Sequence, residues 1–344
     1  MINNPAPLSL EEVLSPAWLG QALNLPVRSV EVVETIKTVA TKVRFRVDLA
    51  TDADAVRAYC AKGVFGSGPL APGYARITQT EANFYRELAA TVGVNTARPR
   101  YTAIDGRTGH GLSVMDDVVA AGGRFLTPLE PYSPKEAMAS LEQLAVMHAL
   151  HWGGAGLDGH AWLRNRLADL AESPLRTVAE LQELLDDPRG DALPAAIKDA
   201  GRVTRALQAL ARHTDGQIDT LVHGDAHAGN LFVLDGATSL VDWQLLQRTN
   251  WGLDVAYHLG AVLSVEDRRE SERDLLDYYL QRLAALGVMA PSRQEAWDVY
   301  RAGVAYGYYL WAVTRRVDPP VIHEFCKRLG TAVADLESFE LLGV

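Results

Sequence analysis

The sequence predicts an α+β protein of two lobes, in which a small antiparallel sheet with one helix precedes a larger, mainly helical lobe. Residues 29–65 are rich in β-branched side chains and partly alternate between apolar and polar, as strands do. Beyond residue 124 most segments show helical spacing instead. Because the composition changes between these parts, we expect an N-lobe of residues 1–117 and a C-lobe of residues 118–344.

Strands and one inserted helix account for the N-lobe. Ser9 and Glu12 have the spacing of a capping box, which indicates a short opening helix. A longer helix is expected over residues 77–93, with Gly93 as its stop. The strands are expected at residues 29–37, 42–50, 55–65, 99–105 and 112–118. A polar turn at residues 51–54 leads into the third strand, and the helix follows that strand.

Helices make up most of the expected C-lobe. Ser133 and Glu136, with proline at position 134, mark the start of a helix that runs to about residue 151. Further helices are expected around residues 160–172, 175–186, 194–213, 252–263, 267–286, 292–316 and 319–340. Two short strands are expected within residues 221–244. The acidic, proline-punctuated segment 174–193 is compatible with a mobile flap or with a pair of solvated helices.

An aromatic stripe at helical spacing lies within residues 297–311. It consists of Trp297, Tyr300, Val304, Tyr308 and Trp311. Such a stripe is typical of a helix packed into a core. It is also compatible with the wall of a pocket for a flat or apolar ligand.

Charge and cysteine content exclude several classes of function. The chain of 344 residues has 33 basic and 43 acidic side chains and a formal net charge of −10, so it lacks the positive surface that nucleic-acid or anionic-lipid binding needs. No apolar run is long enough to span a membrane, and the first residues do not resemble a signal peptide. Two cysteines, Cys60 and Cys326, are expected to pack as small apolar side chains. We therefore expect a cytoplasmic protein without a nucleic-acid or membrane partner.

Residues 221–244 concentrate the polar side chains that suggest chemistry. In order they are His223, Asp225, His227, Asn230 and Asp242. In kinase-type phosphoryl transfer, an Asp and an Asn separated by four residues lie on one loop, where the Asp accepts a hydroxyl proton and the Asn holds magnesium. A second Asp, after the next hairpin, holds the metal that bridges the phosphates. Magnesium is needed there because carboxylates cannot face a triphosphate directly.

This loop carries a resemblance to a known superfamily. "HGDAHAGN" followed by "LVDWQ" resembles the aminoglycoside phosphotransferase and choline kinase-like superfamily, which has a protein-kinase-like fold. Residues 241–259 look most like the bacterial ecdysteroid-kinase-like (CHK kinase-like) proteins. The resemblance implies a catalytic loop at residues 223–230 with Asp225 as the base, and Asn230 and Asp242 as ligands of Mg²⁺.

Two further residues of this region acquire structural roles from the resemblance. His223 resembles the histidine that braces the catalytic loop. Asp254 resembles the buried aspartate that accepts hydrogen bonds from the backbone of the loop. For His227 no role follows from the family.

The resemblance also predicts where ATP contacts the N-lobe. Lys62, at the end of the third strand, should reach the α and β phosphates and pair with Glu81 on the following helix, with Glu87 as the fallback partner. Main-chain groups near Asp116 and Val118 should bond the adenine edge.

The loop expected to cover the phosphates departs from the kinase pattern. Kinases use a glycine-rich loop, whose backbone N–H groups approach the phosphates closely. Here the corresponding residues 37–43 contain no glycine, and the hydroxyls of Thr38 and Thr41 are the available substitutes.

Together these features predict an ATP- and Mg²⁺-dependent kinase that phosphorylates a hydroxyl of a small molecule. One alternative is a regulatory protein that binds nucleotide without turnover. A second is a metal-dependent phosphoesterase, because "GDAHAG" comes close to a Gly-Asp-x-His-Gly metal element. That site would need more ligands, for which His148, His151 and His160 are candidates. The plain structural explanation of the loop is turn chemistry, which Asp and Asn favour.

Overall fold

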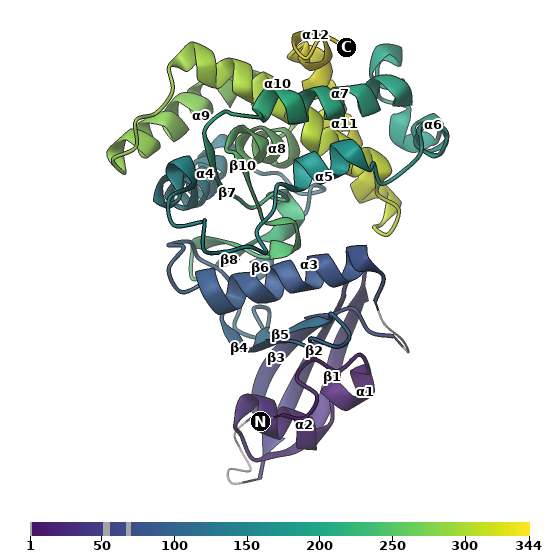
Figure 1. The fold of residues 1–344 in the computed structure, drawn as a ribbon, viewed down its shortest axis with the longest axis vertical. Helices are drawn as coiled ribbons and strands as arrows, with labels where there is room; N and C mark the ends of the chain where they lie inside the picture. Colours follow the sequence, from purple (N-terminus) through teal and green to yellow (C-terminus); the bar gives the residue numbers. More distant parts are fainter. Residues whose placement is uncertain (1, 51–55, 67–69) are drawn as a thin grey trace.

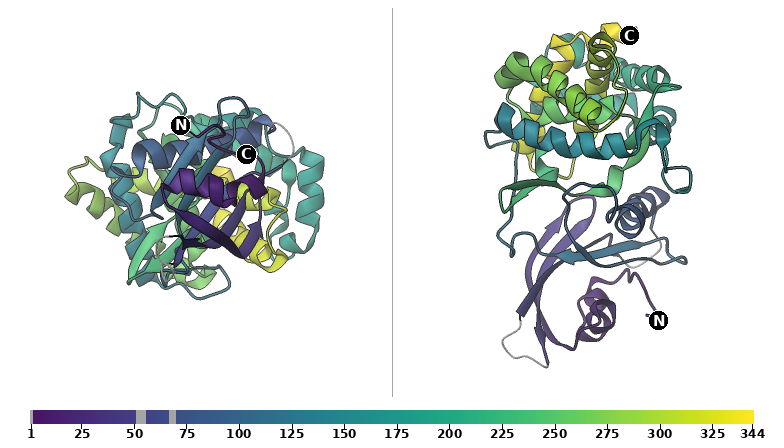
Figure 2. Two further views of the ribbon diagram at one scale, coloured as in Figure 1. Left: turned by 90° about the horizontal axis from the view of Figure 1, so that it is seen from below. Right: turned by 90° about the vertical axis from the view of Figure 1, so that its left-hand side faces the viewer.

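Two lobes stacked along the long axis form the molecule (Figure 1). The computed structural model describes residues 2–50, 56–66 and 70–344. The polar turn predicted at residues 51–54 lies outside these residues. Figures 1 and 2 place the N-terminus in the lobe that holds the sheet and the C-terminus at the far end of the helical lobe.

A five-stranded antiparallel sheet is the framework of the N-lobe, as predicted. Its strands are β1 (Val27–Lys37), β2 (Thr41–Leu49), β3 (Val56–Gly63), β4 (Pro99–Ile104) and β5 (Gly111–Asp116). They pair in the order β1-β2-β3-β5-β4. This order leaves β3 in the middle of the sheet, between β2 and β5. Lys62, near the end of β3, is therefore central in the sheet.

The helix inserted after the third strand is α3 (Pro72–Asn83), which continues as a π-helical turn over Phe84–Leu88. It begins five residues before the predicted start at Ile77, because Pro72 occupies the first turn, where proline is favoured. The opening helix is also present as α1 (Leu10–Val13), capped by the side chain of Ser9. A second short helix, α2 (Pro16–Leu23), was not predicted.

The C-lobe is built from α4 (Pro134–Leu150), α5 (Arg166–Glu172), α6 (Val178–Asp186), α7 (Ala200–Thr214), α8 (Gly252–Val262), α9 (Val265–Ala285), α10 (Arg293–Val313), α11 (Pro319–Asp335) and α12 (Ser338–Leu341). Every residue of α8 is buried. A helix enclosed on all sides can hold polar groups in fixed positions, provided that each is hydrogen bonded. Among the described residues, no helix is long and apolar enough to cross a membrane.

The two open questions about the C-lobe helices are answered by burial. On α10, Tyr300, Tyr308 and Trp311 are buried, so the aromatic stripe belongs to the core. In the segment 174–193, α6 buries Leu181 and Leu185 completely. The prediction of a mobile flap or a solvated helix pair is therefore wrong for α6, because its leucines supply the apolar face that the acidic composition concealed.

Short strands bring the predicted catalytic stretch together. The expected hairpin consists of β8 (Leu231–Leu234) and β9 (Ala237–Leu240), extended by β6 (Arg124–Phe125). A second antiparallel pair, β7 (Asp219–Val222) with β10 (Gln247–Asn250), was not predicted. It joins the chain just before the loop to the chain just after the hairpin, and so closes this region at its base.

Both cysteines are free thiols. Burial raises the pKa of Cys60 to about 11 and that of Cys326 to about 12. Both thiols are therefore protonated at neutral pH and behave as small apolar groups.

Candidate active site

The backbone of the loop at residues 223–230 is held by one buried carboxylate. Asp254, on α8, accepts hydrogen bonds from the N–H groups of His223 at 2.7 Å and Gly224 at 2.8 Å. His148 Nε2 lies 3.1 Å from the same carboxylate. The side chain of Asp254 is fully buried, and these contacts satisfy it. The structure thus places Asp254 where the sequence resemblance expected it.

His223 connects the loop to the following hairpin. Its Nδ1 accepts the N–H of Asp225 at 3.2 Å, so Nε2 carries the proton and donates to the carbonyl of Val241 at 3.0 Å. Burial lowers the pKa of His223, which keeps the ring neutral. Because both ring nitrogens are engaged by the protein, His223 is a structural support rather than a metal ligand in this geometry.

Gly224 is the position where the loop requires glycine. Its φ is +77°, and a Cβ there would lie 2.3 Å from the carbonyl oxygen of Leu245. Tyr306, on α10, donates a hydrogen bond to the carbonyl of Gly224 at 3.0 Å. The sharp turn after His223 is therefore fixed from both sides.

Asp225 and Asn230 face each other across the loop. Nδ2 of Asn230 donates to the main-chain carbonyl oxygen of Asp225 at 2.9 Å and to the carboxylate oxygen Oδ2 of Asp225 at 3.0 Å. These bonds orient the amide, and among the described residues no group donates to its Oδ1. Burial alone would raise the pKa of Asp225, but the nearby His227 lowers it below its ordinary value. Asp225 is therefore ionised and can accept a proton.

A tyrosine that the sequence analysis missed orients the other oxygen of this carboxylate. Tyr257, on α8, donates its hydroxyl proton to Oδ1 of Asp225 at 3.0 Å. The same hydroxyl accepts the indole N–H of Trp311 at 2.7 Å. Burial raises the pKa of Tyr257 well above its ordinary value, so the hydroxyl stays protonated and remains a donor. No spacing rule joins residues 225, 257 and 311, and only the packing of α8 against α10 brings them together.

Asp242 returns to the loop at the end of the hairpin. Its backbone is left-handed, with φ at 68°, and the N–H of the preceding Val241 donates to the carbonyl of Asn230 at 3.0 Å. The pairing of Leu231 with Leu240 aligns the two strands. The predicted hairpin thus carries Asp242 back beside Asn230.

Two lysines of the N-lobe contact Asp242. Lys62 lies 2.7 Å and Lys42 lies 3.1 Å from its carboxylate. Burial alone would raise the pKa of Asp242, but the two cations lower it well below its usual range. Lys42 belongs to residues 37–43, the glycine-free segment, but was not singled out in the sequence. It could have been recognised because it lies directly opposite Lys62 on the neighbouring strand.

Lys62 also forms the ion pair expected for it. Its ammonium lies 2.9 Å from the carboxylate of Glu81 on α3. Burial alone would lower the pKa of Lys62, but Asp242 and Glu81 raise it, so the lysine is charged. The fallback partner Glu87 points elsewhere and hydrogen bonds His160 and Trp162.

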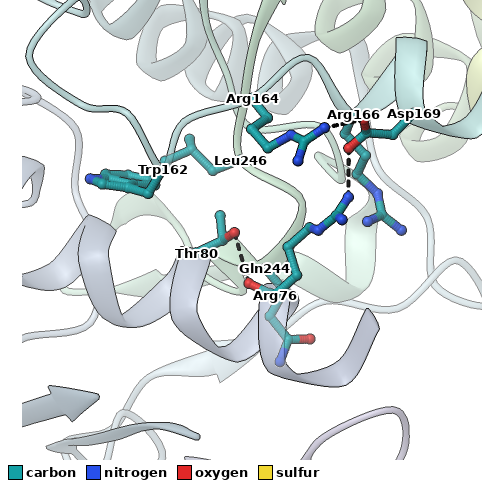
Figure 3. A pocket seen from close by; sticks show the side chains of 8 residues that line it. All are labelled: Arg76, Thr80, Trp162, Arg164, Arg166, Asp169, Gln244 and Leu246. Atoms are coloured by element: carbon teal, nitrogen blue, oxygen red, sulfur yellow. Dashed lines mark hydrogen bonds and ion pairs between the residues drawn. The ribbon is translucent and has the colours of Figure 1, made fainter. Parts of the chain in front are cut away.

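Contacts on both faces of α3 hold Glu81 in place. On the inner face, Trp243 donates its backbone N–H to Glu81 at 3.3 Å and stacks on Phe84 with 3.8 Å between the ring centroids. On the outer face, Arg76 of α3 pairs with Asp169 of α5 at 2.6 Å (Figure 3). The helix is therefore tied to the C-lobe beside the Lys62–Glu81 pair.

The oxygen donors at this place suit a magnesium ion. Magnesium in phosphate sites is commonly held by one or two protein oxygen ligands, with phosphate oxygens and water completing its six positions. Asn230 Oδ1 and the carboxylate of Asp242 are ligands of this kind. The described residues contain no cluster of three or more His, Cys, Asp or Glu side chains suited to a metal.

The other residues predicted to contact the nucleotide hydrogen bond to main-chain groups nearby. The hydroxyl of Thr38 donates to the carbonyl of Ala40 at 3.2 Å, and Thr41 begins β2 beside it. The N–H of Asp116 donates to Arg98, and the carbonyl of Val118 accepts from Gly123. The N–H of Asp116 is therefore already used within the protein, whereas the carbonyl of Val118 can accept a second hydrogen bond; the adenine contact near these residues stays a prediction.

His227, for which no role was predicted, supports the loop. Its Nδ1 accepts the N–H of Gly229 at 3.0 Å, and its Nε2 lies 3.7 Å from Asp225 Oδ2. The ring packs edge-on against Trp311 and Phe325, with 5.1 Å between the centroids in each case.

Comparison with known proteins agrees with this geometry. A family model described as the ecdysteroid kinase-like family matches residues 160–288. The choline kinase LicA from Streptococcus pneumoniae superposes with a TM-score of 0.51 at 14% identity, over 96% of this chain and 99% of that one. The chain has the choline kinase and aminoglycoside phosphotransferase fold. The resemblance seen in the sequence is thereby confirmed at the level of the fold.

Two further solved structures support the same assignment. An amicoumacin kinase, in complex with AMP-PNP, Ca²⁺ and Ami, gives a TM-score of 0.53 at 15% identity, covering 92% of each chain. The aminoglycoside 2′-phosphotransferase-IIIa, in its GDP complex, gives 0.51 at 15% identity over 92% of this chain and 96% of that one. A search among curated proteins found no match. At these identities the likeness establishes the fold and leaves the reaction to be argued from the site.

Proposed function

We propose that this protein is an ATP- and Mg²⁺-dependent kinase that transfers the γ-phosphoryl group to a hydroxyl of a small molecule. The observation that carries the proposal is the convergence of Asp225, Asn230 and Asp242 with the Lys62–Glu81 pair. This is the set of groups that phosphoryl transfer requires, and they come from both lobes. The structural relatives are a choline kinase, an amicoumacin kinase and an aminoglycoside phosphotransferase, and their transfer of phosphate to small molecules supports the proposal by analogy.

Each residue has a distinct task in the proposed reaction. Lys62, held by Glu81, would pair with the α and β phosphates. Asn230 and Asp242 would hold Mg²⁺, which would neutralise negative charge on the phosphates. The acceptor oxygen forms the new bond to the γ-phosphorus while the bond to the bridging oxygen of ADP breaks. Asp225 accepts the hydroxyl proton, and Tyr257 keeps its carboxylate in position.

The contributions of this chain are chiefly positioning and charge. Asp225 is already ionised and oriented by Asn230 and Tyr257, so little reorganisation is needed when the acceptor arrives. The ammonium of Lys62 offsets carboxylate charge on Asp242 and Glu81 until phosphate is bound. We expect these events in the cytoplasm, where ATP and Mg²⁺ are available.

The test is ADP release from Mg-ATP, measured with a panel of hydroxylated small molecules. Asp225→Asn should lose at least about a thousandfold in turnover, equivalent to roughly 4 kcal/mol, while Mg-nucleotide binding by calorimetry is retained. Asp242→Ala should lose turnover and also weaken binding of the nucleotide in the presence of Mg²⁺. Glu87→Gln is the matched control and should remain active. Glu87 lies six residues after Glu81 but hydrogen bonds His160, outside the site.

The two alternatives give different results in the same assays. A regulatory nucleotide-binding protein would bind Mg-ATP and release no ADP with any hydroxyl compound. A phosphoesterase would cleave phosphate esters without ATP and respond to Mn²⁺ or Zn²⁺. Turnover by Asp225→Asn at the wild-type rate would show that Asp225 is not the base.

A further inference from the structure

A cleft between the two lobes indicates what kind of acceptor the protein binds, and this inference rests on the proposed function. A cleft of about 870 Å³ opens between the tip of the β1–β2 hairpin and the turn that joins α10 to α11. Figure 1 shows this turn above the hairpin tip and the start of α3. Its lining residues are Ile36, Lys37, Thr38, Val39, Thr41, Val64, Phe65, Tyr74, Arg315, Arg316, Val317 and Asp318.

The charge of the cleft is opposite to that of the protein. Lys37, Arg315 and Arg316 line it with one carboxylate, Asp318, whereas the whole chain has a net charge of −10. Among the residues that the structure describes, none of these three cations forms an ion pair with a carboxylate. Many arginines elsewhere in the C-lobe do form such pairs. Cations from both lobes, left available around one hollow, favour an anionic ligand group.

Apolar side chains form the rest of the lining. Ile36 and Val39 are 40% and 47% exposed and present apolar surface to the cleft. Phe65 and Tyr74 extend this surface on the side of the N-lobe. The guanidinium of Arg316 lies 5.9 Å from the centre of the Tyr74 ring, which holds the arginine at the rim of the cleft. A ligand that fits must combine an acidic group with an apolar body.

The turn that lines the cleft follows the helix that supports the proposed base. Trp311, near the end of α10, donates to Tyr257, which in turn donates to Asp225. The helix ends at Val313, and Arg315 lies two residues beyond it in the turn to α11. Arg189 donates to the carbonyls of Ala312 and Thr314, so the end of α10 and the start of the turn are anchored. The two arginines therefore follow directly on an anchored helix end.

From these observations we infer that the acceptor is a hydroxylated acid with an apolar body, whose carboxylate lies between Arg315 and Arg316 while its hydroxyl reaches Asp225. Lys37, on the hairpin, would close over the acid from the N-lobe. An acceptor with several amino groups, or a cationic alcohol, would meet like charge at the same place and is disfavoured.

The test compares matched compounds. A panel of hydroxylated acids on linear, aromatic and fused-ring skeletons is used together with the methyl ester of each acid and with an amine in its place. ADP release from Mg-ATP gives kcat and KM for every member. We expect the best acid to exceed its ester and its amine at least tenfold in kcat/KM, and higher ionic strength to reduce this preference.

Substitution of the two arginines tests whether they cause the preference for acids over esters and amines. Arg315→Gln and Arg316→Gln should each raise KM for the acid about fivefold, the upper value for a partly exposed ion pair, and leave KM for ATP unchanged. The double variant Arg315→Glu/Arg316→Glu should reverse the preference toward the amine. Arg212→Gln, an exposed arginine on α7 away from the cleft, is the control and should not alter either KM.

Binding measured without turnover separates this inference from the proposed function. Equilibrium dialysis of the same acids and esters against the wild-type protein, with and without Mg-ADP, should show tighter binding of acids even if no phosphate is transferred. Equal binding or turnover of acids, esters and amines would overturn the inference. So would arginine variants whose effect falls on KM for ATP alone, because the cations would then serve the nucleotide phosphates.

Discussion

The proposed catalytic loop at residues 223–230 and the tip of the β1–β2 hairpin are stabilised very differently. In the loop, His223 and Asn230 are buried, and both side chains donate hydrogen bonds within the C-lobe. At the hairpin tip, the N–H and the hydroxyl of Thr38 both donate to the carbonyl of Ala40, and Val39 is exposed. The loop is therefore shaped by folding, whereas the hairpin has few contacts that would resist a change of position on ligand binding.

The largest effect is expected where the loop loses its main support. Asp254→Ala leaves the backbone N–H groups of His223 and Gly224 buried without an acceptor. Each unsatisfied donor costs roughly 1–3 kcal/mol, so the free energy of unfolding should fall by about 3 kcal/mol or more. Urea denaturation measures this change. Thr38→Val in the hairpin is the comparison and should change stability by less than about 0.5 kcal/mol. Equal losses for the two variants would contradict the contrast between the regions.

A smaller effect is expected from the tyrosine that orients the base. Tyr257→Phe removes the donor to Asp225 Oδ1, and a hydrogen bond to a charged group is worth roughly 1.5–3 kcal/mol. We expect kcat to fall about tenfold or more while KM for ATP is unchanged.

The pH profile of the same variant identifies the cause. The pKa of Asp225 lies below its ordinary value, so the carboxylate is charged above that pKa and loses activity as the pH falls through it. Loss of the tyrosine donor should raise this pKa and move the acid limb of kcat to higher pH. A fall in kcat without any shift of the acid limb would indicate a purely structural role.

The smallest effects are expected in the hairpin itself. Lys42→Met removes one of the two cations beside Asp242, at a position that is 30% exposed. KM for Mg-ATP should rise roughly fivefold, since an exposed pair contributes at most about 1 kcal/mol. Thr38→Val should change KM less than twofold, because its hydroxyl is already used within the turn. A larger effect for Thr38 than for Lys42 would show that the threonine, and not the lysine, replaces the missing glycine contacts.

Spacing in the sequence was sufficient to predict the part of the site whose residues lie close together in the chain. Asp225 and Asn230 lie on one short loop, and the apolar strands between Asn230 and Asp242 imply a hairpin, so the relation among the three follows from chain geometry. The five strands of the N-lobe could also be predicted, because alternation and turns mark each strand, whereas their pairing order came from the structure. The roles of these residues in catalysis stay predictions until the variants are measured.

Contacts between distant segments were beyond the reach of spacing. Glu81 and Glu87 are both plausible partners for Lys62 in the sequence, and only the orientation of α3 directs Glu81 inward. Tyr257 was not singled out in the sequence, because only the packing of α8 brings its hydroxyl to Asp225. The pair β7–β10 was missed because four-residue strands carry too weak a pattern.

For this protein, the sequence by itself determined the fold class, the loop that carries the proposed base and the expected metal ligands, because these depend on local periodicity and on residues close together in the chain. The tertiary structure decided which glutamate meets Lys62, how Lys42 and Tyr257 join the site, and which charges line the acceptor cleft. Those features depend on the packing of α3, α8 and α10, which brings together side chains that no local pattern relates.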